Sequence, residues 1–333
     1  MIYYILYVVV ILIVNLFIKK NKLAINNYQL DHQKFVNIKT PLIGGFFLIF
    51  PVIILFYNYD LFFSFTCILI FLLGISSDFN ILSSPKKRFL IQLIIILIFV
   101  LTNKIQVIPS RIDLVDEFFL HTFWSYLFSA FCLMTLMNGS NFIDGLNGLL
   151  LGYLLIILLI IYKLNLYSLI NISNEQFYFL IFIFFVILTL NILNQFFLGD
   201  SGAYFLSFFM GYFLIEIYNA NLKISPYFII LLLWYPCFEN LFSIIRKSRN
   251  KSALKPDNNH LHQLLFSLIK SKYQLRDLTT NIISSIMINM FNLILLYAAS
   301  IKPYNSIIQL NLLVIASLSY VFVYILIKKS LKK

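Results

Sequence analysis

Long apolar runs alternate with short polar segments along almost the whole chain. A helix that crosses a bilayer needs about 20 predominantly apolar residues, and eleven runs approach or reach that length. They cover roughly residues 1–18, 42–57, 61–76, 89–103, 118–137, 148–162, 177–196, 203–219, 226–245, 281–300 and 307–327. Pro51 lies inside the second run, where it would bend a helix. The pattern predicts an all-α, polytopic membrane protein with about 11 transmembrane helices and a single domain over residues 1–333.

Composition agrees with a chain whose solvent is the lipid bilayer. Hydrophobic residues make up 61% of the sequence and charged residues 11%, with a mean hydropathy of +0.91. Soluble domains carry about 25% charged residues, so this chain has too few to cover a water-facing surface. Cys67, Cys132 and Cys237 lie inside apolar runs without metal-type spacing, as small buried hydrophobic residues do.

The basic residues are distributed unevenly between the two predicted sides of the membrane. With the N-terminus outside and eleven crossings, 20 of the 25 Lys and Arg residues fall on the inside. The positive-inside rule therefore predicts an outside N-terminus and a cytoplasmic C-terminus. The same bias accounts for the net charge of +12, so the charge indicates topology and not a nucleic-acid partner.

Glycines, carboxylates, amides and bases gather in the segments that are predicted to lie inside. The outside loops carry no comparable cluster, because the acids of loop 104–117 lack a glycine-rich turn. We therefore expect one active face, built by cytoplasmic loops. These loops cover about residues 19–41, 77–88, 138–147, 197–202 and 246–280.

These residue types suit phosphoryl transfer. Asp78, Asp144 and Asp200 stand beside small residues at predicted helix ends, and carboxylates with substrate phosphates are the usual ligands of Mg²⁺. Glycines such as Gly145 let backbone N–H groups approach a phosphate, and bases such as Arg88 pair with it. The combination favours metal-assisted phosphoryl transfer.

Each feature also has a plainer interpretation. Asp78 stands near a basic run, where a loop acid often forms only a salt bridge, and the bases at 86–88 are also simple topology signals. Asn138 and Asn141 suit helix caps. Glu239 is an acid inside an apolar run, which makes it a functional suspect, but the sequence leaves it open between a functional and a structural role.

Five motifs follow one another between about Lys34 and Gln263. They are Thr40-Pro-x-x-Gly-Gly45, Gly74-x-x-Ser77-Asp78 with Ser84-Pro-Lys-Lys-Arg88 and Gln92, Asn138-x-x-Asn141-x-x-Asp144-Gly-x-Asn147-Gly, Phe197-Leu-Gly-Asp200-Ser-Gly, and Pro256-Asp257-x-x-His260-Leu-His262. In this order they resemble the motifs of the polyprenyl-phosphate N-acetylhexosamine-1-phosphate transferases, the MraY/WecA-type enzymes of glycosyltransferase family 4. The His-x-His segment is nearer to the WecA branch.

The chain departs from the family pattern at several positions. Ser77 replaces the first acid of an Asp-Asp pair, Asn147 replaces the second acid of its motif, and Gln263 replaces the last histidine. Val36 and Ala203 replace a histidine and a serine. The change at Ser77 has the largest expected consequence, because it removes a carboxylate from the region where the metal is expected.

The resemblance implies a reaction and its partners. A UDP-amino sugar would give its N-acetylhexosamine-1-phosphate, or a related amino-sugar phosphate, to undecaprenyl phosphate, and UMP would leave. The reaction would be the first membrane step of cell-envelope polysaccharide synthesis, at the cytoplasmic face of the bacterial inner membrane. The resemblance implies Mg²⁺ as cofactor, with Mn²⁺ as an alternative, and is compatible with a homodimer.

The resemblance also implies roles for individual residues. Asp200 is expected to bind the metal with help from Asn141, and Asp78 is expected near the lipid phosphate as a base or phosphate orienter. The expected catalytic residues are Asp78, Asp144, Asp200 and His260. The expected substrate-binding residues are Lys34, Lys87, Arg88, Asn138, Asn141, Gly145, Asn147 and His262.

Two other functions stay open at this point. A transporter or flippase for an anionic or lipid-linked solute would also have many spans, although transporters place their polar residues at the membrane midplane and often show repeats. A catalytically weakened relative, acting as a scaffold, is the second alternative and is motivated by Ser77. The sequence does not select the sugar or the polysaccharide pathway.

Overall fold

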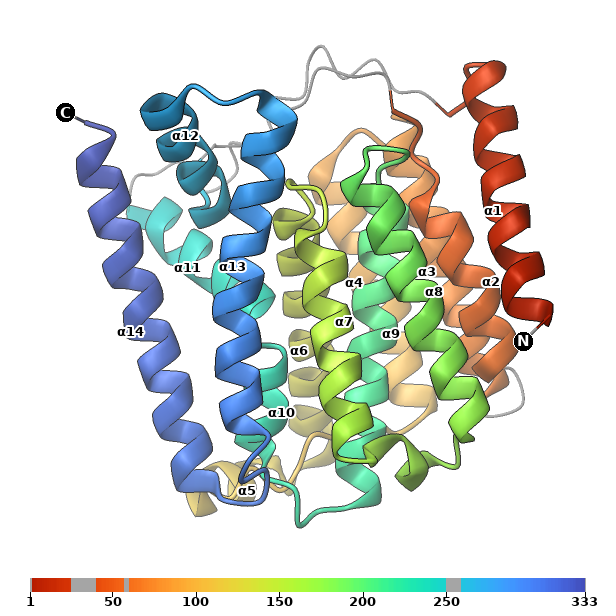
Figure 1. Ribbon diagram of the computed structural model, residues 1–333. Coiled ribbons are helices and arrows are strands. Elements are labelled where there is room, and N and C mark those ends of the chain that lie inside the picture. The colour runs from red at the N-terminus through yellow and green to blue at the C-terminus, as the bar shows by residue number, and fades with distance from the viewer. Residues whose placement is uncertain (1, 25–39, 57–59, 250–258, 333) are drawn as a thin grey trace.

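The computed structural model describes residues 2–24, 40–56, 60–249 and 259–332, and these residues form a helical bundle (Figure 1). Its helices are α1 (Ile2–Lys20), α2 (Gly44–Phe56), α3 (Leu61–Asp78), α4 (Pro85–Thr102), α5 (Asp113–Phe119), α6 (Thr122–Ile143), α7 (Leu149–Lys163), α8 (Asn174–Ile192), α9 (Gly199–Ala220), α10 (Pro226–Leu232), α11 (Trp234–Arg249), α12 (Leu261–Tyr273), α13 (Asp277–Ala299) and α14 (Ser306–Ser330), with a 3-10 helix at Leu166–Ile170. The predicted all-α fold is confirmed for this part of the chain.

Each of the eleven apolar runs is helical over most of its length. Among the described residues, five helices are long and apolar enough to cross a membrane: α3, α8, α9, α13 and α14. The number rises to seven if α5–α6 and α10–α11, which are bent by 108° and 77°, each form one span. The chain is therefore a multi-pass membrane protein. The count of eleven crossings and the orientation of the termini stay predictions.

The structure adds two features that the apolar pattern did not predict. Helix α12 lies within the basic segment 246–280, where no long apolar run marks it, and it packs against α13 and α14. The second feature is the break between α10 and α11. Pro236 stands in the first turn of α11, the one part of a helix that tolerates a missing N–H, so a new helix starts there instead of continuing α10.

Helix α9 is the buried centre of the bundle, and 94% of its most apolar stretch is buried. Two other helices approach its first turn backbone to backbone. A Cβ atom on Gly74 of α3 would lie 2.2 Å from the Cα atom of Ser201, and one on Gly45 of α2 would lie 2.7 Å from the Cα atom of Gly202. Small residues permit such close helix contacts, so α2 and α3 fix the place where α9 begins.

The segment before α2 is attached to the segment before α9. The Gly44 N–H donates to the Phe197 carbonyl at 2.9 Å, and the Phe197 N–H donates to the Pro41 carbonyl at 2.9 Å. The side-chain amide of Asn194 also donates to Thr40 Oγ1 at 3.1 Å. The motif that begins at Thr40 and the motif that begins at Phe197 are therefore hydrogen-bonded to each other next to the start of α9.

We expect Gly74→Ala to destabilise the protein much more than Gly211→Ala. The added methyl group at position 74 would meet the backbone of α9, whereas at position 211 it would meet only the ends of the Leu133 and Leu136 side chains, at 2.8 and 2.9 Å. Overpacking costs about 1–3 kcal/mol, which for a chain of this length corresponds to a fall in melting temperature of about 1–4 °C. Thermal unfolding in detergent, followed by intrinsic fluorescence, measures the difference. Equal melting temperatures would contradict the proposed backbone contact.

Candidate active site

Asp78 joins the end of α3 to the start of α9. Its Oδ1 atom accepts a hydrogen bond from the Asp200 N–H at 2.8 Å, and its Oδ2 atom accepts one from the Ser201 N–H at 3.1 Å. Gly199 has a φ of +79°, and a Cβ atom there would lie 2.7 Å from Asp78 Oδ2. A carboxylate at a helix N-terminus satisfies otherwise unpaired N–H groups. Asp78 therefore positions α9, and its predicted catalytic role stays a prediction.

The carboxylate of Asp200 collects donors from three other helices. Asn141 of α6 donates its amide to Oδ1 at 2.7 Å, and Arg88 of α4 donates Nη1 to Oδ2 at 2.8 Å. The Ser77 hydroxyl, on α3, donates to Oδ2 as well. The Asp200 and Arg88 side chains keep exposed fractions of 29% and 22%. Four helices thus meet at one charged group that a ligand can still reach.

Ser77 has a specific place in this cluster. Its hydroxyl accepts a hydrogen bond from Arg88 and donates one to Asp200, so it bridges the two charged side chains. An aspartate at this position would place a second carboxylate beside Asp200, and like charges at such a distance disfavour each other. The serine therefore leaves one carboxylate to pair with one guanidinium. A partly exposed pair contributes little stability, so its main effect is on geometry.

A small polar pocket lies beside Asp200 and brings distant motifs together. Its lining comes from the end of α6, the start of α9 and the start of α12. The lining residues are Asn141, Phe142, Asp144, Gly145, Asp200, His260 and Gln263. Five of the residues that the sequence predicts for the site therefore share one wall, although about 120 residues separate the first from the last.

His260 is held in this pocket by contacts with Glu239 and Gln263. Its Nδ1 atom lies 2.9 Å from Oε1 of the buried Glu239, and its backbone N–H donates to the side-chain oxygen of Gln263 at 3.3 Å. The second contact gives a physical reason for glutamine at position 263, because its side chain caps the start of α12. His262 is fully buried, and burial lowers its pKa to about 3, so its ring is neutral at pH 7.

The remaining predicted substrate contacts within the described residues do not line the pocket. Lys87 is exposed on the first turn of α4, and the Asn138 amide donates to the Met134 carbonyl of its own helix at 2.8 Å. His262 is buried behind His260, and Lys34 lies outside the described residues. The substrate contacts of these four residues stay predictions.

Asn147 belongs to a buried network of amide groups. Its side chain donates to the Asn191 carbonyl at 3.1 Å and to Asn194 Oδ1 at 3.2 Å, while its N–H donates to Asn281 Oδ1 at 2.7 Å. The Gly148 N–H donates to Asn191 Oδ1 at 2.6 Å. The network attaches the loop after α6 to α8 and α13 and so supports the pocket. The predicted contact of Asn147 with the substrate stays a prediction.

The donor set of the pocket fits a magnesium ion. Within the described ranges, no three His, Cys, Asp or Glu side chains are grouped so that they could hold a metal ion by themselves. Mg²⁺, however, usually takes one or two carboxylates and completes its shell with water and substrate phosphates. Asp200, Asp144 and Asn141 line the same pocket, and their carboxylates and amide are the kinds of oxygen donor that such a site needs.

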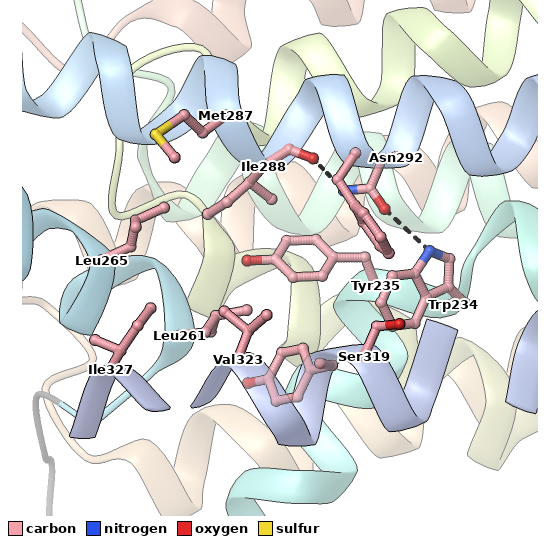
Figure 2. A pocket seen from close by; sticks show the side chains of 12 residues that line it. Trp234, Tyr235, Leu261, Leu265, Met287, Ile288, Asn292, Ser319, Val323 and Ile327 are labelled. Atoms are coloured by element: carbon pink, nitrogen blue, oxygen red, sulfur yellow. Dashed lines mark hydrogen bonds between the residues drawn. The ribbon is translucent and has the colours of Figure 1, made fainter. Parts of the chain in front are cut away.

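A separate apolar cavity of about 180 Å³ lies between α11, α12, α13 and α14. Figure 2 shows its walls, in which the Trp234 indole donates to Asn292 Oδ1 at 3.0 Å and the Asn292 amide donates to the Ile288 carbonyl at 3.0 Å. These polar groups are satisfied by one another, so the cavity offers apolar surface. Leu261 and Tyr320, which both contact Glu239, lie in its wall.

Two residues that shape the site had little signal in the sequence. Glu239 was a suspect because it is an acid in an apolar run, but nothing in the sequence paired it with His260. Tyr320 lies in the last apolar run, and its hydroxyl donates to Glu239 Oε2 at 2.7 Å. Tyrosines are frequent in this chain, with 21 in total, so no pattern distinguished this one.

We expect Asp78→Ala to lower the melting temperature by about 1–3 °C, because loss of a helix cap costs about 1–2 kcal/mol. Asp78→Asn should give an intermediate value, since its amide keeps one acceptor oxygen. Asp113→Ala is the matched control, because Asp113 is an exposed acid in the first turn of α5. Thermal unfolding of the three variants checks this. A melting temperature of Asp78→Ala equal to that of the control would refute the capping role.

Comparison with known proteins agrees with this geometry. The family model described as glycosyl transferase family 4 matches residues 61–218, which include Asp78, Asn141 and Asp200. A protein of Bacillus subtilis (strain 168), named probable undecaprenyl-phosphate N-acetylglucosaminyl 1-phosphate transferase, is 28% identical over 211 residues. That alignment covers 60% of this chain and 56% of the relative, so it spans little more than half of the relative's length. Motif order, the convergence of the motifs at the start of α9 and these matches agree that the chain is similar to glycosyl transferase family 4 over residues 61–218.

Proposed function

We propose that this protein transfers N-acetylhexosamine-1-phosphate, or a related amino-sugar phosphate, from a UDP-amino sugar to undecaprenyl phosphate and releases UMP. The observation that carries the proposal is the cluster at the start of α9. There Asp200 binds Arg88 and Asn141 and faces a pocket that Asp144 and His260 also line. The name of the Bacillus subtilis relative supports the acceptor and the type of group transferred.

The arrangement suits the charges of the proposed substrates. Both are phosphate anions that must approach each other. His260 lines the pocket, and Arg88 contacts Asp200 in its wall. An oxygen of the acceptor phosphate would attack the sugar-linked phosphorus, and the bond from that phosphorus to the UMP oxygen would break. Catalysis of such a transfer depends on positioning and on stabilising developing negative charge. Arg88 is placed to offset that charge on the diphosphate.

A divalent cation would add to this effect. Mg²⁺, or Mn²⁺ in its place, bound by Asp200 and Asn141 would supply positive charge next to the diphosphate. Asp144 and Gly145 line the same pocket, and we assign them to the nucleotide side of the donor. Asp78 acts through the backbone of α9 and orients Asp200.

The apolar cavity supports a lipid acceptor. It lies among four helices at the side of the bundle that holds His260, and its wall contains Leu261, the residue after His260. A prenyl chain in this cavity would place its phosphate near the polar pocket. We place the reaction at the cytoplasmic face of the bacterial inner membrane, as the first membrane step of a cell-envelope polysaccharide, in an enzyme of the WecA branch.

We expect the purified protein to release UMP only when undecaprenyl phosphate, Mg²⁺ and the correct UDP-N-acetylhexosamine are all present. A panel of donors identifies the sugar, and EDTA tests the metal. Asp200→Asn should lower kcat by about 10²–10³-fold, the usual effect of losing a key electrostatic group. Full turnover by Asp200→Asn would refute its assigned role.

Arg88→Ala should lower kcat by at least about tenfold, whereas Lys86→Ala should leave it unchanged. Lys86 is an exposed base two residues away in the first turn of α4, so the pair separates the contact with Asp200 from a general loss of positive charge. No UMP release by the folded wild type with any donor would instead favour the weakened relative or the transporter, and Ser77→Asp would be the next variant.

A further inference from the structure

Glu239 is a buried carboxylate that the proposed reaction does not yet use. It lies in α11 with an exposed fraction of 1%. Burying a carboxylate is costly unless hydrogen bonds and a charged or polar partner compensate it.

Both carboxylate oxygens of Glu239 have hydrogen-bond partners. Oε1 lies 2.9 Å from His260 Nδ1 and accepts a hydrogen bond from the Leu261 N–H at 3.3 Å. Oε2 accepts a hydrogen bond from the Tyr320 hydroxyl at 2.7 Å. The carboxylate therefore connects the start of α12 to α14, with His260 at one end and Tyr320 at the other.

The ring of His260 is also held by its neighbours. The Phe142 ring lies 4.9 Å from it between centroids, and the His262 ring lies 5.7 Å from it. When the Nδ1 atom donates to a carboxylate, the proton is fixed on that nitrogen and the orientation of the ring is set. The Nε2 atom is then the ring nitrogen whose protonation can change. His260 lines the polar pocket together with Asp200.

Tyr320 is a rigid anchor for this carboxylate. Its ring lies 5.0 Å from Phe238 and 5.3 Å from Phe242, both on α11. The side chain has an exposed fraction of 3%. These aromatic contacts hold the ring in one position. The hydroxyl therefore stays directed at Glu239, and the carboxylate keeps one position.

We propose that Glu239 is the positioning residue for His260. Anchored by Tyr320, it keeps one proton of the imidazole on Nδ1 and supports a second proton on Nε2, which then donates to the diphosphate of the donor in the pocket. The role of Nε2 toward the diphosphate rests on the proposed function, whereas the fixed tautomer rests on the contacts alone. A carboxylate behind a histidine also stabilises the ring when it gains a second proton.

Three substitutions in the full-length protein test the proposal by kinetics. Glu239→Gln removes the charge of the acceptor, and Tyr320→Phe removes the hydroxyl that anchors it. Tyr324→Phe is the control, because Tyr324 lies one helical turn from Tyr320 on α14 and its ring lies 4.9 Å from that of Phe242. Residues that orient a functional group typically contribute about 10–100-fold. We expect Glu239→Gln to lower kcat by about that factor with little change in KM for the UDP-sugar, because the effect appears in the transition state. Tyr320→Phe should lower kcat less, and Tyr324→Phe should not change it.

A second readout is independent of turnover. The chain has four histidines, His32, His121, His260 and His262, so ¹⁵N-labelled histidine gives few ring signals, and His260→Gln assigns those of His260. The wild type should show a proton-bearing Nδ1 for His260. This signal should weaken in Glu239→Gln, because an amide can either accept from or donate to Nδ1 and no longer fixes the proton, and it should be unchanged in Tyr324→Phe. A merely structural role of Glu239 would not move the tautomer in a folded variant.

The outcomes separate the two proposals. Unchanged kcat in folded Glu239→Gln, or a His260 ring without a proton on Nδ1, would overturn the positioning role. If Glu239→Gln does not fold, Tyr320→Phe decides, and kcat and ring signals equal to those of Tyr324→Phe would overturn the role. A wild type that turns over no donor would contradict the proposed function alone. The ring-nitrogen comparison would then still decide whether Glu239 fixes His260.

Discussion

The two hydrogen bonds that Asp78 accepts from the first turn of α9 set the geometry on which the candidate site depends. They hold the backbone N–H groups of Asp200 and Ser201, so the carboxylate of Asp200 starts from a fixed point. The close contact at Gly74 brings α3 near enough for these bonds to form. Because α9 is almost entirely buried, its first turn has little freedom to move, and the groups that converge on Asp200 meet a rigid target.

The site is supported from two sides that share no residues. On one side, α3 and α4 supply Ser77 and Arg88, which bind one oxygen of Asp200. On the other side, α11 and α14 supply Glu239 and Tyr320, which hold His260. The polar pocket lies between them, so a bound diphosphate would meet a guanidinium and an imidazole that are oriented independently. This separation explains how the chain can lack a carboxylate at position 77 and still present an ordered charged cluster.

The sequence was sufficient for most of the fold and for part of the site. The apolar runs predicted the helices because burial in lipid demands such runs, and the order of the motifs predicted that Asp200, Asn141 and His260 would lie together. The sequence could not show that Asn147 and His262 are buried and do not line the pocket, because a motif does not specify the direction of each side chain. Helix α12 was missed because mixed polar and apolar residues hide it. Tyr320 was missed because its partner lies 81 residues away, and only the packing of α11 against α14 brings the two together.

The central claim is that the start of α9 is where a nucleotide sugar is bound. The most direct measurement is an experimental structure of the full-length protein in a lipid nanodisc with the UDP-amino sugar that it binds. We expect the diphosphate to lie within hydrogen-bond distance of Arg88 and His260, and the nucleotide to lie beside Asp144 and Gly145. Nucleotide bound at the opposite end of the bundle, or an Asp200 side chain turned away from the ligand, would contradict this expectation.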